Sequence, residues 1–255
     1  MKNLIRLTAV VLVALMAILT FASCGTEADT NTDGEKKTLT MVTNAEFPPY
    51  EYYDGDKIVG IDAEVAAAIA EKLDMELEIV DIDFDSIVPS VQTGKYDMGM
   101  AGLTVNPERL EQVNFSTSYA KGVQVVIVTE DSAIASIDDL ADKKIGAQQG
   151  TTGAIYAADD FGDDNVVLYQ NGALAVEGLK GGKVDCVIID NEPAKAYVAA
   201  NEGLKILETE YANEDYAICF AKENTELQTN VNAALEELIA DGSLQKIVDK
   251  YIAAK

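Results

Sequence analysis

Arg109 stands where a predicted helix begins, soon after a strand-like run that ends in the segment Gly102–Thr104. Asn106 and the proline after it form a usual start of a helix. A positive charge is unfavourable in the first turn, because the helix dipole is positive at that end. The guanidinium is therefore expected to face an anion, and its planar fork suits a carboxylate. The alternative is a surface ion pair with Glu108 or Glu111.

Asp190 follows directly after the apolar run Val184–Ile189, which is a predicted strand. Ligands of open α/β sheets bind beyond the carboxyl ends of the strands, so a carboxylate in this position is a candidate for binding a cation. The alternative is a structural role, in which Asp190 caps the helix that begins near Pro193.

Two further segments follow predicted strands. Gln149–Gly153 opens a helix, so its free N–H groups point toward whatever lies beyond the helix end. It is not a phosphate loop, because no Gly-Lys-Ser/Thr follows. Asn44–Tyr52 holds aromatic residues around a stiff Pro-Pro turn, which suits the walls of a small-ligand site. The alternative is that these rings only fill the core.

Taken together, the four segments offer one arginine, one aspartate, backbone donors and aromatic walls. An α-amino acid presents one carboxylate, one ammonium group and a side chain. The sequence therefore predicts a site for a small amino acid.

Strand-like and helix-like segments alternate along the chain, which predicts an α/β protein with mostly parallel sheets flanked by helices. The predicted strands are Thr38–Thr43, Glu76–Val80, Asp97–Leu103, Val123–Thr129, Lys144–Ala147, Val166–Tyr169, Val184–Ile189 and Tyr216–Ala221. The predicted helices are Ile61–Leu73, Asp85–Gln92, Ser136–Ala141, Ala173–Lys180, Pro193–Asn201, Thr225–Ala240 and Ser243–Ile252, with others starting at Asn106 and Thr151.

The composition argues against several classes of function. The 255 residues carry a formal net charge of −25, which opposes binding to nucleic acid. There is no histidine, the commonest general base and metal ligand. No metal or cofactor is expected. Cys186 and Cys219 each lie in an apolar run and are expected to be buried free thiols.

The N-terminus has the features of a secretory signal. Lys2 and Arg6 precede the apolar run Ala9–Leu19, which is too short for an ordinary membrane span. Small residues then lead to Cys24, which predicts a lipoprotein signal peptide over 1–23 with Cys24 as the lipidated residue. The alternative is a plain secreted protein in which Cys24 is an odd free thiol. Residues 24–37 are polar and charged, which predicts a disordered tether on the outer face of the cell membrane.

Several motifs resemble, in order, the polar amino acid-binding proteins of ABC importers, the extracellular solute-binding proteins of family 3. The resemblance covers nearly all of Thr38–Ile252 and rests on Phe47-Pro48-Pro49-Tyr50-Glu51, Val59-Gly60-Ile61-Asp62, Phe84–Pro89, Gly102–Arg109, Asn114-Phe115-Ser116 and Gln149–Gly153.

The resemblance implies a role for each site residue. Arg109 would bind the ligand α-carboxylate with Thr104 and Thr152, and Asp190 would bind the α-ammonium with Gly102 and Thr104. Phe47 and Phe84 would sandwich the ligand side chain, with Tyr50 at its edge. The full set of implied ligand-binding residues is Phe47, Tyr50, Phe84, Gly102, Thr104, Arg109, Thr151, Thr152 and Asp190.

The resemblance also implies a two-lobed, type II periplasmic-binding-protein-like fold. Lobe 1 would be discontinuous, with residues 38–120 and 217–255, and lobe 2 would hold residues 121–216. Two strands would form a hinge that closes the lobes over the ligand. The protein would act as a monomer and deliver its amino acid to an ABC permease.

The ligand's side chain is less constrained. Relatives that select cationic side chains often carry an acid near the first loop, where this chain has Asn44. Glu46 and Glu192 are nearby acids that could serve instead, or could face solvent. A basic or polar amino acid is favoured, while glutamine and cystine remain open.

Two other classes of function compete with the binding protein. Some relatives of this fold are dehydratases, but the sequence shows no nucleophile–base pair of the kind that an enzyme needs. A sensor module that signals through a partner is the third class. We expect a binding protein that is not an enzyme.

Overall fold

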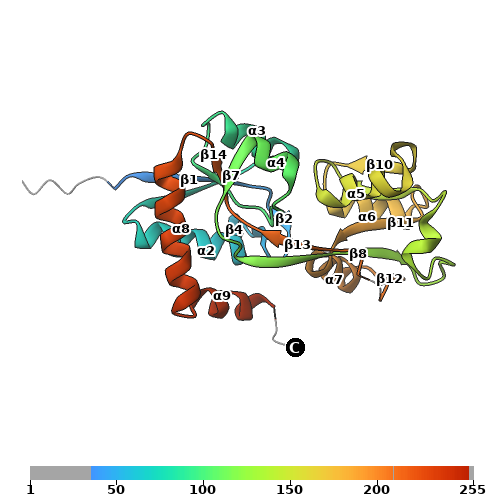
Figure 1. Ribbon diagram of the computed structural model, residues 1–255. Helices are drawn as coiled ribbons and strands as arrows, with labels where there is room; N and C mark the ends of the chain where they lie inside the picture. Colours follow the sequence, from blue (N-terminus) through green and yellow to red (C-terminus); the bar gives the residue numbers. More distant parts are fainter. Residues whose placement is uncertain (1–35, 209, 253–255) are drawn as a thin grey trace, which may run out of the picture. The chain divides into compact units, whose positions relative to one another are not determined.

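Two large β-sheets organise the chain. The computed structural model describes residues 36–208 and 210–252, and Figure 1 shows the helices and strands that alternate along them. The predicted signal peptide, Cys24 and the tether as far as residue 35 lie outside the described residues, so these predictions stay predictions.

The first sheet has five strands in the order β5-β1-β6-β14-β7. Its strand β1 (Thr38–Thr43) runs parallel to β5 (Glu76–Asp81) and to β6 (Met98–Gly99). β14 (Cys219–Ala221) runs antiparallel to β6 and to β7 (Val113–Phe115). The sheet is therefore parallel on one side and antiparallel on the other.

An apolar helix stripe covers one face of this sheet. α2 (Ile61–Lys72) carries Val65 and Ile69 one helical turn apart, and both are fully buried. α8 (Thr225–Ala240) and α9 (Ser243–Tyr251) pack against α2, as the red and blue-green ribbons of Figure 1 show. Burying one aliphatic side chain of this size contributes about 1.5–3 kcal/mol, so these contacts hold the C-terminal helices to the N-terminal part of the chain.

The second sheet has the same design. Its path is β10-β9-β11-β8-β12, with β13 also paired to β8. β10, β9 and β11 are parallel, whereas β8 runs antiparallel to β11, β12 and β13. The strands are β8 (Ala120–Thr129), β9 (Ile145–Gln148), β10 (Val166–Tyr169), β11 (Cys186–Asp190), β12 (Leu204–Ile206) and β13 (Ala212–Tyr216). The helices of this half are α5 (Thr152–Phe161), α6 (Gly172–Lys180) and α7 (Asn191–Ala200).

The two sheets define two lobes, which we call lobe 1 and lobe 2 after the first and second sheet. β8 and β13 run side by side between them, with Tyr216 opposite Ala120 and Glu214 opposite Gly122 (Figure 1). The residues at the two predicted lobe boundaries thus lie opposite each other on paired strands. The lobe boundaries at residues 121 and 216 stay predictions.

Shorter elements complete the fold. A small antiparallel sheet contains β2 (Glu46–Phe47), β3 (Glu51–Asp54) and β4 (Lys57–Val59). Among the described residues, the remaining helices are α3 (Ile87–Gln92) and α4 (Pro107–Gln112), with 3₁₀ turns at Phe84–Ser86, Ile137–Leu140 and Asp163–Asn165.

The predicted alternation and most element positions are confirmed, but the sheets are mixed rather than mostly parallel. The predicted strand Tyr216–Ala221 is in fact the end of β13 and the whole of β14, which lie in different sheets. The apolar run is continuous because the chain is buried both at the end of β13 and in β14, on either side of the point where it passes from one sheet to the other. Of the predicted strand Asp97–Leu103, only Met98–Gly99 forms the strand β6, and the chain turns farther along at Gly102, whose φ is +51°.

Among the residues that the structure describes, no helix combines the length and the apolar character needed to cross a membrane.

Gly122→Ala is expected to destabilise the fold by about 1–3 kcal/mol, because a Cβ at this position would lie 2.4 Å from the buried ring of Tyr216. Urea unfolding measures the loss. Lys121→Ala on the same strand is the control, because its side chain is 76% exposed and its ion pair with Asp215 contributes little. Equal stability of the two variants would contradict the close packing of β8 against Tyr216.

Candidate ligand-binding site

Residues of both lobes line one small cavity of about 20 Å³. Eight of the nine residues proposed for ligand binding border it, and only Tyr50 does not. The lining residues are Asn44, Phe47, Phe84, Ala101, Gly102, Thr104, Arg109, Gln148, Thr151, Thr152 and Asp190. The structure therefore brings together groups that are far apart in the sequence.

Arg109 is buried in the cavity wall, with 6% of its surface exposed. Asn106 caps α4 by accepting the Arg109 N–H at 2.7 Å, which places the side chain at the helix start. The Arg109 guanidinium donates to the Thr104 carbonyl of lobe 1 at 2.7 Å and to the Gly150 carbonyl of lobe 2 at 3.0 Å. The proposed ion pairs with Glu108 or Glu111 do not form among the described residues.

The charge of Arg109 is held away from water. Burial lowers the pKa of Arg109, and the negative charge of Glu214 opposes this effect. The Phe84 ring lies 5.5 Å from the guanidinium carbon, which is within the range of a cation–π contact. The remaining N–H groups of Arg109 are the ones that can bind an anion.

The start of α5 adds donors beside Arg109. Thr151 caps the helix by accepting the Ala154 N–H at 3.3 Å, and its own hydroxyl donates to the Gln148 carbonyl at 2.8 Å. The hydroxyls of Thr152 and Thr104 approach to 3.5 Å across the cleft. An anion near Thr152 would therefore meet the positive end of a helix as well as Arg109.

Asp190 ends β11 and is 8% exposed. It occupies the N-cap position of α7, but its side chain makes no capping bond. Instead, its carboxylate accepts from Gln124 Nε2 at 2.8 Å and from the Tyr216 hydroxyl. The capping alternative is therefore wrong for the side chain. Burial, with the charge of Glu214 next, raises the pKa of Asp190 to about 7.

Gly102 is held so that it offers a carbonyl rather than an N–H. Its N–H donates to the buried Asp62 carboxylate at 2.9 Å, and the Tyr119 hydroxyl donates to the same oxygen at 2.8 Å. A Cβ on Gly102 would lie 2.9 Å from the Phe47 ring, so a side chain there would push the cavity wall. Burial raises the pKa of Asp62 to about 6.

The aromatic residues differ in role. Phe47 and Phe84 border the cavity. Tyr50 is 3% exposed and packs against Phe47 and Tyr216, with its ring centre 5.9 Å from that of Phe47 and 5.2 Å from that of Tyr216. The alternative in which the rings of Asn44–Tyr52 fill the core therefore describes Tyr50, whereas Phe47 borders the cavity.

The three proposed specificity residues are separated. Asn44 lines the cavity and accepts from Gln148 Nε2 at 2.9 Å. Glu46 is exposed and borders a neighbouring cavity of about 530 Å³, which also contains Asn44, Asp81, Ile82, Asp83, Ser86, Ser90, Lys95 and Gln170. Glu192 lies in the first turn of α7, where it forms an ion pair with Lys195.

Four polar residues at the site were not predicted from the sequence. Gln148 stands one residue before the segment Gln149–Gly153, which was predicted to open a helix. Gln124, Glu214 and Tyr216 come from the paired strands β8 and β13 and lie behind Asp190. Gln124 could have been found because it interrupts the apolar run Val123–Thr129. A polar side chain in a buried strand needs a hydrogen-bond partner, so it indicates a polar group nearby.

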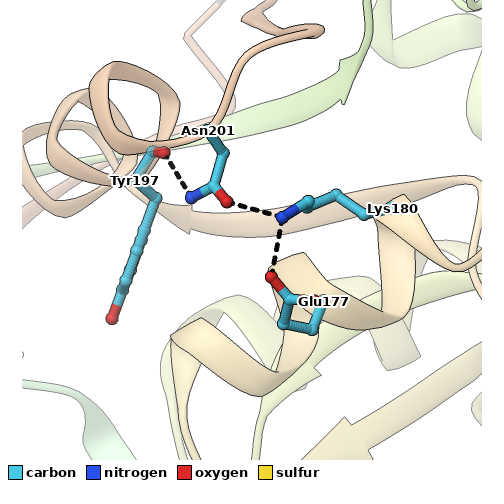
Figure 2. Close-up of polar contacts among 4 residues, drawn as sticks. All are labelled: Glu177, Lys180, Tyr197 and Asn201. Carbon is cyan, nitrogen blue, oxygen red and sulfur yellow. Dashed lines mark hydrogen bonds and ion pairs between the residues drawn. The ribbon is translucent and has the colours of Figure 1, made fainter.

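Further contacts join the lobes at the rim of the cleft. The Tyr197 hydroxyl on α7 donates to the Glu46 carbonyl of lobe 1 at 2.9 Å. Asn201 binds the Tyr197 carbonyl at 2.9 Å, and Lys180 on α6 donates to Asn201 and to Glu177, each at 2.8 Å (Figure 2). The end of α7 is thereby tied to α6, which keeps Tyr197 in place.

The lobes are closed on each other in this structure. Besides the Gln148–Asn44 bond, Gln170 of lobe 2 donates to Asp83 of lobe 1 at 2.8 Å. A cavity of about 20 Å³ holds little more than one water molecule, so an amino acid can enter only when the lobes move apart.

The described residues contain no cluster of three or more histidine, cysteine or carboxylate side chains that could hold a metal. Cys186 and Cys219 are buried free thiols, as predicted. Burial raises the pKa of each to about 12, which makes both unreactive.

Two lobes joined by paired strands, with an arginine and an aspartate between them, define a solute-binding protein fold of the periplasmic type. Residues 39–254 match the family described as bacterial extracellular solute-binding proteins, family 3. The chain belongs to this family.

Individual relatives cover almost the whole chain. The chain is 32% identical to the arginine-binding extracellular protein ArtP of Bacillus subtilis, over 96% of this chain and 98% of that protein. It is 27% identical to the L-cystine-binding protein TcyJ of Escherichia coli, over 99% and 96% of the two chains. The solved structure of the arginine-, lysine-, histidine-binding protein ArtJ of Geobacillus stearothermophilus matches with a TM-score of 0.82 and 32% identity, over 86% of this chain and 96% of that one.

Asp190→Asn is expected to keep the fold and to stabilise the protein without ligand at about pH 8. Ionising a carboxyl whose pKa is raised to about 7 costs folding free energy above that pH, and the amide stays neutral. One pKa unit corresponds to about 1.4 kcal/mol, so a gain of about 1–3 kcal/mol is expected in urea unfolding. The gain should shrink at about pH 5, where the carboxyl is protonated. A loss of stability at both pH values would show that Asp190 is needed to begin α7.

Proposed function

We propose that the protein captures an L-α-amino acid between its lobes and delivers it to an ABC permease. The observation that carries this proposal is the pair of buried, opposite charges, Arg109 and Asp190, at one cavity between the lobes. An amino acid backbone carries the complementary pair.

Each backbone group of the ligand has partners. The α-carboxylate would bind the free N–H groups of Arg109 and the start of α5 at Thr152, as a bidentate, charge-assisted contact. The α-ammonium would bind the Asp190 carboxylate and the Gly102 carbonyl. Phe47 and Phe84 would hold the side chain between them.

We favour a ligand with a basic side chain. Arg109 is the single cation among the residues that line the cavity, whereas Asp190 lines it and Glu214 lies directly behind. A ligand of net charge +1 offsets the surplus negative charge better than a zwitterion does. Asn44 lies between this cavity and the neighbouring cavity of about 530 Å³, which Glu46, Asp81 and Asp83 border. A long ligand side chain would extend toward these acids. The similarity to an arginine-binding protein supports arginine as the ligand, and the similarity to an L-cystine-binding protein keeps cystine as the alternative ligand.

The same site supports binding rather than catalysis, so we propose that the protein is not an enzyme. We also propose that it is a monomer, held by a lipid on Cys24 at the outer face of the cell membrane. A dehydratase and a ligand sensor are the alternatives. Turnover of a bound amino acid would support the first.

Thermal melting against the twenty amino acids, ornithine and cystine tests the proposed function. The protein is first unfolded and refolded to remove bound ligand. A ligand at 100 times its Kd adds about 2.7 kcal/mol, which raises the Tm by several degrees. Arginine, lysine or ornithine should give the largest shift. A shift with a neutral amino acid alone would contradict the basic ligand, and no shift at all would contradict amino acid binding.

Arg109→Ala is expected to weaken ligand binding by about 2–5 kcal/mol in calorimetry, because the ligand carboxylate would be buried without its partner. Glu108→Ala is the matched control, because Glu108 is the next residue on α4 but does not line the cavity. Equal affinity of the two variants would place the carboxylate elsewhere.

Glu46→Gln is expected to lower the affinity for arginine about two- to fivefold, and to leave glutamine binding unchanged, since an exposed charge contributes about 0.2–1 kcal/mol. The effect should fade at high salt. Glu192→Gln is the control, because its carboxylate is already paired with Lys195. A larger effect of the control would assign the selectivity to Glu192.

A further inference from the structure

Asp190 and Glu214 are joined through a single amide group. Gln124 Nε2 donates one hydrogen bond to Asp190 at 2.8 Å and another to Glu214 at 2.9 Å. The three side chains come from β11, β13 and β8, on the same face of the second sheet. Two carboxylates therefore lie within reach of one nitrogen atom.

All three side chains are removed from water. Asp190 is 8% exposed, Glu214 is 6% exposed and Gln124 is 1% exposed. Among the described residues, one oxygen of Glu214 and the amide oxygen of Gln124 have no hydrogen-bond partner. Unpartnered buried oxygens are costly, so an arrangement like this needs a compensating function.

The surrounding groups supply little positive charge. Tyr216 on β13 donates to Asp190, and Tyr50 of lobe 1 lies beyond it. Tyr156 on α5 faces Glu214, and burial, with the charge of Glu214 next, raises the pKa of Tyr156 to about 12. Arg109 on α4 is the cation that acts on both carboxylates. The one positive charge of Arg109 faces two carboxyl groups, so a proton or a further cation is needed to neutralise the second negative charge.

We propose that Glu214 is a positioning residue for the ligand ammonium. Through the Gln124 amide it orients the Asp190 carboxyl group, and its negative charge helps Asp190 to retain a proton that the arriving ammonium group displaces to solvent. This inference rests on the proposed function. The ligand is thus exchanged for a proton, and the charge of the buried site changes little on binding.

The exchange gives ligand affinity a defined pH dependence. Burial and the charge of Glu214 raise the pKa of unliganded Asp190 to about 7, and a bound ammonium favours the ionised carboxylate. Affinity should be highest above about pH 7 and fall up to tenfold per pH unit below it. About half a proton should be released per ligand near pH 7.

Calorimetry of the parent protein with arginine measures this release, by comparing buffers of different ionisation enthalpy between about pH 5 and 8.5. Glu214→Gln keeps the shape of the side chain but removes its charge. The variant should bind about three- to tenfold more weakly at about pH 8 and release less proton near pH 7, and its loss of affinity should begin at a lower pH. Glu214→Asp retains the charge and should restore the parent pH profile.

Glu210→Gln is the matched control, because it removes the same charge from an exposed position shortly before β13. It should show the parent pH profile. A parent-like profile and proton count for Glu214→Gln would overturn the proposal, and would leave Glu214 as a packing residue.

A measurement without ligand separates this proposal from the proposed function. Because folding raises the pKa of Asp190, the folded state holds a proton that the unfolded state has lost between about pH 4 and 7, and stability falls as the pH rises through that window. The fall should be smaller in Glu214→Gln than in Glu210→Gln. Equal slopes would contradict the proton retained on Asp190 even if arginine binds. Unequal slopes without any amino acid binding would instead contradict the proposed function alone.

Discussion

The cleft keeps one guanidinium and two carboxylates out of water, and the rest of the structure depends on how these charges are held. The free energy of burying an ion is offset only where hydrogen bonds and opposite charges surround it. Arg109 is held by carbonyls from both lobes, and Asp190 by donors from β8 and β13. The contacts that hold the charge of Arg109 therefore also join the two lobes.

The contacts that cross the cleft also explain why this site is suited to reversible capture. Most of them pair an amide or hydroxyl with a neutral oxygen or an exposed carboxylate, as Gln148 does with Asn44 and Tyr197 does with Glu46. Such bonds contribute about 0.5–1.5 kcal/mol each and exchange readily with water. The lobes can thus separate without exposing an apolar core, because each lobe has its own.

Sequence reasoning found the residues whose position follows from local structure. Arg109 and Asp190 could be predicted because Arg109 stands at the start of a predicted helix and Asp190 at the end of a predicted strand. The helix Thr225–Ala240 could be predicted because the pattern of its apolar residues is local. Gln124 and Glu214 were not visible, because their meeting depends on how β8 and β13 pair across 90 residues of chain. The continuous apolar run Tyr216–Ala221 also concealed the boundary between the sheets, because burial looks alike in both.

The order of strands in the first sheet has a consequence for how the chain assembles. β14 lies between β6 and β7, and Cys219 pairs with Gly99 and Phe115, which precede it by more than a hundred residues. During synthesis from the N-terminus, β7 therefore has no neighbour in its sheet until the whole of lobe 2 has emerged. Contacts of such long range form slowly, whereas the parallel strands β9, β10 and β11 of lobe 2 lie closer together in the sequence. The lobe that contains Arg109 is consequently the last to be completed, and a chain that stops before β14 leaves β6 and β7 with open edges that favour aggregation.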